Sequence, residues 1–227
     1  MEKRLVWNWF DLILVCFFSF GFLYFIFILL KYLEIKKISS LFAFFLFLIQ
    51  DGILLFFVWI LIIRKYRINF SYFGLKKYPV VNSLVYGFSG LLASLFLILI
   101  VGFFFNLFNL PGFSGETRSL VPIFGNGFLG FCFSVSAAGI IAPFVEEIFF
   151  RGFIQSTLSK YLGNLFALLL TSFIFAFSHL EFDLFVPLFI FGLVLGYLYL
   201  STRSLWPSIF MHALKNLGAV FIMYLMS

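Results

Sequence analysis

One apolar stretch shows what kind of chain this is, and it reads GFCFSVSAAGIIAPFVEEIFFRGFIQSTL over residues 130–158. It is long enough to cross a bilayer, because a transmembrane helix needs about 20 predominantly apolar residues. Three ionisable side chains lie inside it, namely Glu146, Glu147 and Arg151. Such groups are costly at membrane depth, so their presence within a span predicts a functional site.

The composition of the whole chain agrees with a membrane environment. Of the 227 residues, 64% are hydrophobic and only 11% are charged, and the mean hydropathy is +1.16. Soluble domains contain roughly 45–50% apolar and about 25% charged residues, so this chain could not cover its apolar surface in water. We therefore expect an all-α, polytopic transmembrane helix bundle whose main partner is the lipid bilayer.

Apolar runs separated by charged residues or by glycine and proline predict about seven spans. The first run lacks a small-residue cleavage site after it, so we expect it to remain as a span. One integral bundle is expected, with N-terminal helices in residues 1–110 and a core of four spans in residues 111–227. The expected spans cover residues 12–30, 38–63, 81–108, 130–158, 164–180, 184–200 and 205–226.

The net charge of +6 could suggest nucleic-acid binding, but the cations gather at the ends of the spans. The positive-inside rule explains that distribution and favours an N-in, C-out orientation with no nucleic-acid partner. Residues 66–79 read either as a cytoplasmic interfacial segment or as an ordinary basic loop. Residues 109–127 read as a re-entrant or external loop. Cys16 and Cys132 have no metal-ligand spacing and are expected to be small core residues.

Two further polar pairs follow the glutamates along the chain. His179 ends the expected fifth span one turn after Phe175, and His212 precedes Asn216 by the same i,i+4 spacing on the last span. Residues four apart share a helix face, so each pair projects in one direction. The same rule predicts an ion pair between Glu147 and Arg151, which leaves Glu146 as the carboxylate without a local partner.

Depth along the helix axes indicates whether these groups meet. At a rise of about 1.5 Å per residue, Glu146 and His179 both lie about 21–23 Å from the turn at residues 160–164. Counted from Ser204, His212 lies at about 12 Å and Asn216 at about 18 Å, so Asn216 is expected nearer their level. The alternative is that each polar pair only joins helices. Asp51, in the second span, is expected to pair with Arg151 or Lys215, or else to line a substrate entrance.

The assembled groups are suited to hydrolysis of an acyl bond, most naturally a peptide. A carboxylate and a histidine can activate water, while a second histidine and an amide can donate to a developing oxyanion. No HExxH motif is present, and asparagine is a poor zinc ligand. A metal would need Glu146, His179 and His212 as its ligands, so a mechanism without a cofactor is favoured over one with a divalent metal such as zinc.

At these residues the sequence resembles the CAAX prenyl protease and bacteriocin-processing (CPBP, or Abi) family of intramembrane proteases. Its EExxxR, FxxxH and HxxxN patterns occur in order, and the resemblance extends over about residues 128–220. The matching stretches are APFVEEIFFRGF at 142–153, FAFSH at 175–179 and SLWPSIFMHALKN at 204–216.

The resemblance implies a division of roles among the motif residues. Glu146 and His179 would activate water, His212 and Asn216 would stabilise the oxyanion, and Glu147 and Arg151, together with Phe175, would support the site. The substrate would be a peptide or the tail of a membrane protein. The size of the chain and the lack of a targeting segment favour a bacterial cell membrane.

Two other classes of function stay open at this point. A non-proteolytic immunity or regulatory protein could keep the same fold and bind a partner in the membrane. A small transporter could also carry discontinuous helices and charges near the bilayer midplane. Neither role requires a carboxylate and a histidine arranged to activate water, which favours the protease.

Overall fold

The computed structural model describes residues 5–33, 39–110 and 124–226, and within these ranges the chain is helical and contains no strand. The loop expected at 109–127 falls mostly on residues 111–123, outside the described residues. The N-terminal elements are α1 (Trp9–Tyr32), α2 (Ser40–Val58), the π-helix η1 (Trp59–Arg64), the 3-10 helix η2 (Phe70–Phe73) and α3 (Val80–Leu107).

The C-terminal half begins with a long helix that changes type several times. It is followed by a short 3-10 helix and two further α-helices. In chain order these elements are α4 (Phe128–Ser134), the π-helix η3 (Val135–Ile141), α5 (Ala142–Glu147), the π-helix η4 (Ile148–Gln155), α6 (Ser156–Ser178), η5 (Phe182–Leu184), α7 (Phe185–Thr202) and α8 (Trp206–Met226).

Six helices in the described part of the chain are long and apolar enough to cross a membrane, close to the seven spans expected. The difference lies in the fourth, Phe128–Ser178, which is continuous apart from a non-helical Gly163 with φ +78°. The rings of Phe150 and Phe175, one on each side of that glycine, lie 5.3 Å apart. The chain therefore folds back at Gly163, and the two arms correspond to the fourth and fifth expected spans.

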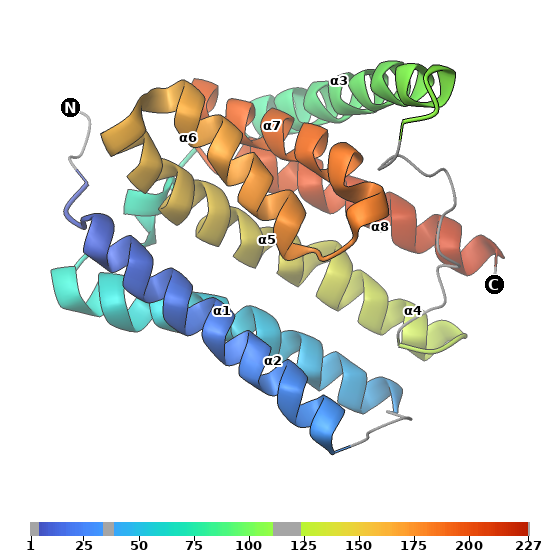
Figure 1. Ribbon diagram of the computed structural model, residues 1–227, viewed down its shortest axis with the longest axis horizontal. Coiled ribbons are helices and arrows are strands. Elements are labelled where there is room, and N and C mark those ends of the chain that lie inside the picture. The colour runs from blue at the N-terminus through green and yellow to red at the C-terminus, as the bar shows by residue number, and fades with distance from the viewer. Residues whose placement is uncertain (1–4, 34–38, 111–123, 227) are drawn as a thin grey trace.

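The helices form one integral multi-pass bundle around the long broken helix (Figure 1). The pair α1 and α2 packs on one side of it, and α2 contacts α5. On the other side α6 packs against α7, and α3 packs against α7 and α8. The described part of the chain starts and ends at opposite ends of the bundle (Figure 1). Which end faces the cytoplasm is not part of this observation, and the N-in, C-out orientation stays a prediction.

The segment at 66–79 docks on the end of the bundle. Phe73 is fully buried and stacks on Trp7, with ring centroids 5.0 Å apart. The N–H of Leu205 donates to the carbonyl of Gly74 at 3.1 Å. Gly74 has φ +95°, and a Cβ there would lie 2.7 Å from Tyr199, so both the turn and the close approach require glycine. This segment ties α8 to the start of the chain.

A buried acid joins α1 to the end of η1 near the same end of the molecule. Asp11 is 1% exposed, and its carboxylate accepts hydrogen bonds from Lys65 and Tyr66, both at 2.6 Å. The hydrogen bond to Asp11 raises the pKa of the Lys65 ammonium. Asp11 also accepts from the backbone N–H of Asn8. Its charge is therefore fully partnered, as a buried carboxylate requires.

Candidate active site

The centre of the candidate site is the carboxylate of Glu147, whose side chain is fully buried. Its Oε1 accepts a hydrogen bond from Nη1 of Arg151 at 2.9 Å, which confirms the expected ion pair. The same oxygen accepts from Nδ1–H of His212, also at 2.9 Å. Arg151 then reaches α7, where Nη2 donates to the carbonyl of Gly192 at 3.3 Å. One buried charge pair therefore joins α5, η4, α7 and α8.

The contact between Glu147 and His212 has a chemical consequence. A carboxylate only accepts, so Nδ1 of His212 must carry the hydrogen, and the orientation of the ring is set by Glu147. Nε2 of His212 then lies 3.9 Å from Oε2 of Glu146. That Glu146 oxygen has no hydrogen-bond partner among the described residues, and 18% of the Glu146 side chain remains accessible. Oε2 of Glu147 also lacks a partner among the described residues, but its Oε1 holds both Arg151 and His212.

Phe175 links the two histidines. Its ring lies 4.7 Å from the ring of His179 and 5.8 Å from that of His212, measured between centroids. The carbonyl of Phe175 accepts a hydrogen bond from Nδ1 of His179 at 2.8 Å. Because a carbonyl only accepts, this bond places the His179 hydrogen on Nδ1 and leaves the Nε2 lone pair free.

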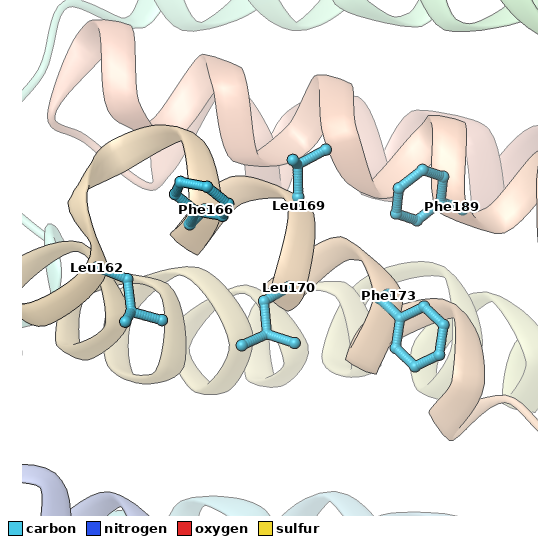
Figure 2. A pocket seen from close by; sticks show the side chains of 6 residues that line it. All are labelled: Leu162, Phe166, Leu169, Leu170, Phe173 and Phe189. Atoms are coloured by element: carbon cyan, nitrogen blue, oxygen red, sulfur yellow. The ribbon is translucent and has the colours of Figure 1, made fainter.

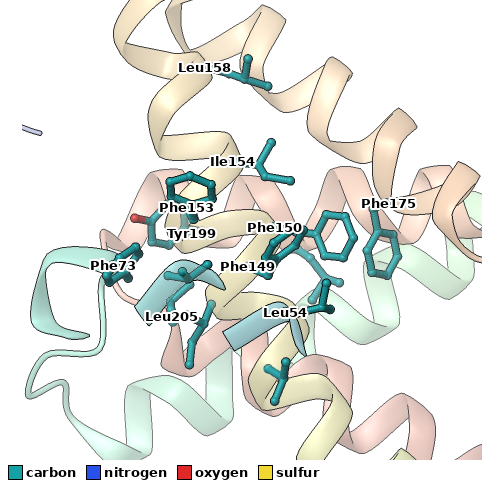
Figure 3. Packing of buried hydrophobic residues seen from close by; sticks show 14 of the residues in the cluster. Leu54, Phe73, Phe149, Phe150, Phe153, Ile154, Leu158, Phe175, Tyr199 and Leu205 are labelled. Carbon is teal, nitrogen blue, oxygen red and sulfur yellow. The ribbon is translucent and has the colours of Figure 1, made fainter. Parts of the chain in front are cut away.

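The Phe175 ring is itself held in place from the other arm of the broken helix. It packs edge-on against Phe150, and the Arg151 guanidinium lies over it, 4.4 Å from the centroid. Figure 3 shows Phe150 and Phe175 together within the buried apolar core. The same Arg151 therefore supports Glu147 through an ion pair and Phe175 through a cation–π contact.

Asn216 contacts the long broken helix through its side-chain amide. Its Nδ2 donates to the carbonyl of Ala138 at 2.8 Å. That carbonyl lacks its usual helical donors, because the N–H of Ala142 bonds to Ala137 in the π-helix η3 and Pro143 has no N–H. Asn216 thus satisfies a backbone group freed by Pro143. Its second amide hydrogen is not used in this bond.

The depth predicted for His212 along the helix axes was wrong. His212, and not Asn216, lies beside the two glutamates. The count measured Glu146 from the turn at residues 160–164 and His212 from Ser204. It treated these two starting points as lying at one depth and the helices as parallel, and the contact between Glu147 and His212 shows that this was not so. The π-helix η4 advances less per residue than an α-helix and accounts for only about 3 Å of the difference.

The expected ion pair of Asp51 is also absent from the described part of the structure. Arg151 is bound to Glu147 and Gly192, and the Lys215 ammonium lies over the ring of Phe191 at 5.5 Å. Asp51 is nevertheless 2% exposed, and its Oδ2 has no partner among the described residues.

The sequence left a metal open at these residues, although a mechanism without a cofactor was favoured. Within residues 5–33, 39–110 and 124–226, no group of three His, Cys, Asp or Glu side chains is gathered closely enough to hold a metal ion. The set that a metal would need, Glu146, His179 and His212, is therefore not assembled as a ligand cage. No step of the chemistry below is derived through a metal.

The chain also has an apolar groove between α6 and α7, away from the charged groups. Figure 2 shows its lining, which contains no ionisable side chain. This groove offers no titratable group to activate water, so the charged groups around Glu147 remain the candidate site. The lining residues are Leu162, Phe166, Leu169, Leu170, Phe173 and Phe189.

Comparison with known proteins gave one family match. Residues 128–218 match the family model described as type II CAAX prenyl endopeptidase Rce1-like. The match covers about two-fifths of the chain. It includes Glu146, Glu147, Arg151, His179, His212 and Asn216 but not Asp51. It confirms the resemblance to the CPBP family and supports an intramembrane protease of the CAAX type. Neither curated proteins nor solved structures gave a match.

We expect Arg151→Met to destabilise the protein strongly. The change leaves the buried Glu147 carboxylate without its cation, and breaking a buried pair in this way costs about 3–5 kcal/mol. Thermal unfolding of the purified protein in detergent should show a Tm lower by several degrees. Lys77→Met, at an exposed position, is the control and should leave the Tm unchanged. Equal Tm values for the two variants would show that the pair does not hold the bundle together.

Proposed function

We propose that the protein is an intramembrane endopeptidase that hydrolyses a peptide bond in a peptide or in the tail of a membrane protein. The observation that carries the proposal is the asymmetry between the two glutamates. Oε1 of Glu147 is bound by Arg151 and His212, and its side chain is fully buried. Oε2 of Glu146 has no partner among the described residues, lies 3.9 Å from Nε2 of the aligned His212, and belongs to a side chain that is 18% exposed. A contact that only joins helices would not need a partly exposed carboxyl side chain with an unpaired oxygen.

Glu146 and His179 are the groups that activate water in this proposal. Glu146 takes a proton from the water as its oxygen attacks the carbonyl carbon of the scissile bond. His179 helps to hold that water through Nε2, which is free to accept because Nδ1–H is bound to the carbonyl of Phe175. The attack forms the new C–O bond and places negative charge on the former carbonyl oxygen.

His212 and Asn216 are the groups that stabilise this oxyanion. Asn216 would use the amide hydrogen that is not bound to Ala138. His212 would donate through Nε2, and because Nδ1–H already donates to Glu147, the ring must first take up a second proton from water. It keeps that proton throughout the reaction. Glu147 balances the charge of that imidazolium, as the aspartate does in a serine-protease triad.

Collapse of the intermediate completes the reaction. The C–N bond breaks, and Glu146 returns the proton it took from water to the leaving nitrogen. The products are a carboxylic acid and an amine, and the enzyme regains its starting protonation state. The chain's own groups therefore suffice for hydrolysis, and we include no cofactor in the mechanism. The site lies within a membrane bundle, so the substrate must reach it from the bilayer or through its end.

Glu146→Gln should abolish proteolysis while the protein still inserts and folds. Removing a general base lowers rates by roughly 10²–10⁴-fold, and glutamine keeps the shape of the side chain. The measurement compares the peptides released by membranes that contain wild type or variant, using mass spectrometry. Glu181→Gln changes an exposed acid and is the matched control, expected to behave as wild type. Identical peptides from wild type and Glu146→Gln would instead favour a non-proteolytic binding protein.

Strong chelators should leave the same activity unchanged. If Glu146 and His179 activate water directly, peptide release should continue after incubation with 1,10-phenanthroline and EDTA, followed by gel filtration. Loss of activity that returns on adding Zn²⁺ would contradict this and would place a metal among Glu146, His179 and His212.

A further inference from the structure

The apolar groove between α6 and α7 lies open on the outside of the bundle. Five of its six lining residues are 40–65% exposed, with Phe166 the most exposed of them. The groove also faces away from the reaction site. Phe173 lines it, whereas Phe175 contacts the two histidines, and residues two apart on a helix point about 200° apart. A molecule in this groove therefore lies on the far side of α6 from the histidines.

The length of the groove matches one half of a bilayer. It runs along α6 from Leu162 at one end to Phe173 and Phe189 at the other (Figure 2). The eleven residues from 162 to 173, at about 1.5 Å each, give a length of about 16 Å. The hydrocarbon core of a bilayer is about 30 Å thick, so the groove is about as long as the apolar part of one leaflet. Its length and its apolar lining thus fit one acyl chain of a membrane lipid.

Cations from both helices lie at the Leu162 end of the groove. Lys160 precedes Leu162 by two residues, and Arg203 follows the end of α7, which packs against α6 and returns to the same end of the bundle. Both residues are exposed. The Lys160 ammonium donates to two backbone carbonyls and to no acid among the described residues, so one of its three N–H bonds remains for a ligand.

The opposite end of the groove carries the opposite charge. The connection from the end of α6 to the start of α7 contains Glu181 and Asp183, and both are exposed. An anionic group is therefore attracted to the end with the two cations and repelled from the other end. Near the cationic end Tyr161 stacks on Trp9, with ring centroids 5.2 Å apart. Tyrosine and tryptophan gather at the level of lipid headgroups, which is where an anionic phosphate would lie.

We propose that this groove binds one anionic phospholipid, with an acyl chain along the apolar lining and the phosphate beside Lys160 and Arg203. The apolar lining alone would accept any hydrocarbon surface, and the surrounding bilayer is equally apolar, so the choice among lipids comes from the headgroup. A lipid bound in this way contacts the ends of both helices and so holds α6 against α7. The proposal does not depend on proteolytic activity.

The test counts the lipids bound to the full-length protein by native mass spectrometry, after purification in a neutral detergent. The probes are dioleoylphosphatidylglycerol, which is anionic, and dioleoylphosphatidylcholine, which has the same acyl chains and no net charge. Titration gives an apparent dissociation constant for each lipid. The same spectra report the oligomeric state.

Lys160→Gln combined with Arg203→Asn removes both cations with little strain, because asparagine tolerates the φ of +54° at Arg203. A basic side chain near the membrane surface strengthens binding of an anionic lipid by a factor of about five, so the double variant should bind phosphatidylglycerol about 25-fold more weakly. Binding of phosphatidylcholine should not change. Lys77→Gln combined with Arg67→Asn is the matched control, since Arg67 also has φ +54° and both positions are exposed. The control should stay within about twofold of wild type for both lipids.

Leu170→Trp tests the position of the acyl chain. The larger ring fills the groove and removes van der Waals contacts of the chain, so binding of both lipids should weaken by a factor of about five or more. Leu165→Trp is the matched control, because Leu165 is an exposed residue of α6 outside the lining of the groove. It should bind both lipids as wild type does.

Four results would overturn the proposal. Equal affinity of wild type for the two lipids would remove the role of the cations. An equal loss in the two charge variants would indicate general attraction to a basic surface. Wild-type lipid binding by Leu170→Trp would show that no chain enters the groove. A wild-type dimer that Leu170→Trp dissociates would assign the groove to a second copy of the chain.

Discussion

A single buried oxygen, Oε1 of Glu147, accepts hydrogen bonds from Arg151 and from His212. Leaving such a carboxylate unpaired in the bundle would be costly, so both partners must be present and correctly placed. Arg151 extends the link to the carbonyl of Gly192 on α7 and to the ring of Phe175. The positions of α5, α7 and α8 relative to one another thus depend on one charge pair. By occupying Arg151 and His212, Glu147 leaves Glu146 without either of them as a hydrogen-bonded partner.

The long helix that carries the glutamates is irregular on both sides of them. It contains two π-helical stretches, one before and one after the glutamates. π-bulges are frequently found at functional sites. Here the first leaves the carbonyl of Ala138 to be satisfied by Asn216, so the irregular stretch provides a second link between α8 and the long helix besides the bond of His212 to Glu147.

The spacing of residues along the sequence predicted side-chain contacts within one helix. It did not predict the contacts between helices. The Glu147 and Arg151 pair and the contact of Phe175 with His179 follow from the i,i+4 rule, and the apolar runs predicted the spans. The bond between Glu147 and His212 joins residues far apart in the chain, so no local pattern contains it. The depth of His212 was misjudged because a residue count does not show how two helices are tilted and shifted relative to each other. Asp51 was expected to be paired, since the sequence does not show that Arg151 is already occupied.

The most direct measurement is a double-mutant cycle with Arg151→Met and His212→Phe, read as the free energy of unfolding in detergent. Because both side chains bind one oxygen of Glu147, their effects should not add, and the coupling energy should be about 1 kcal/mol or more. Effects that sum to that of the double variant within about 0.5 kcal/mol would contradict the central role of Glu147.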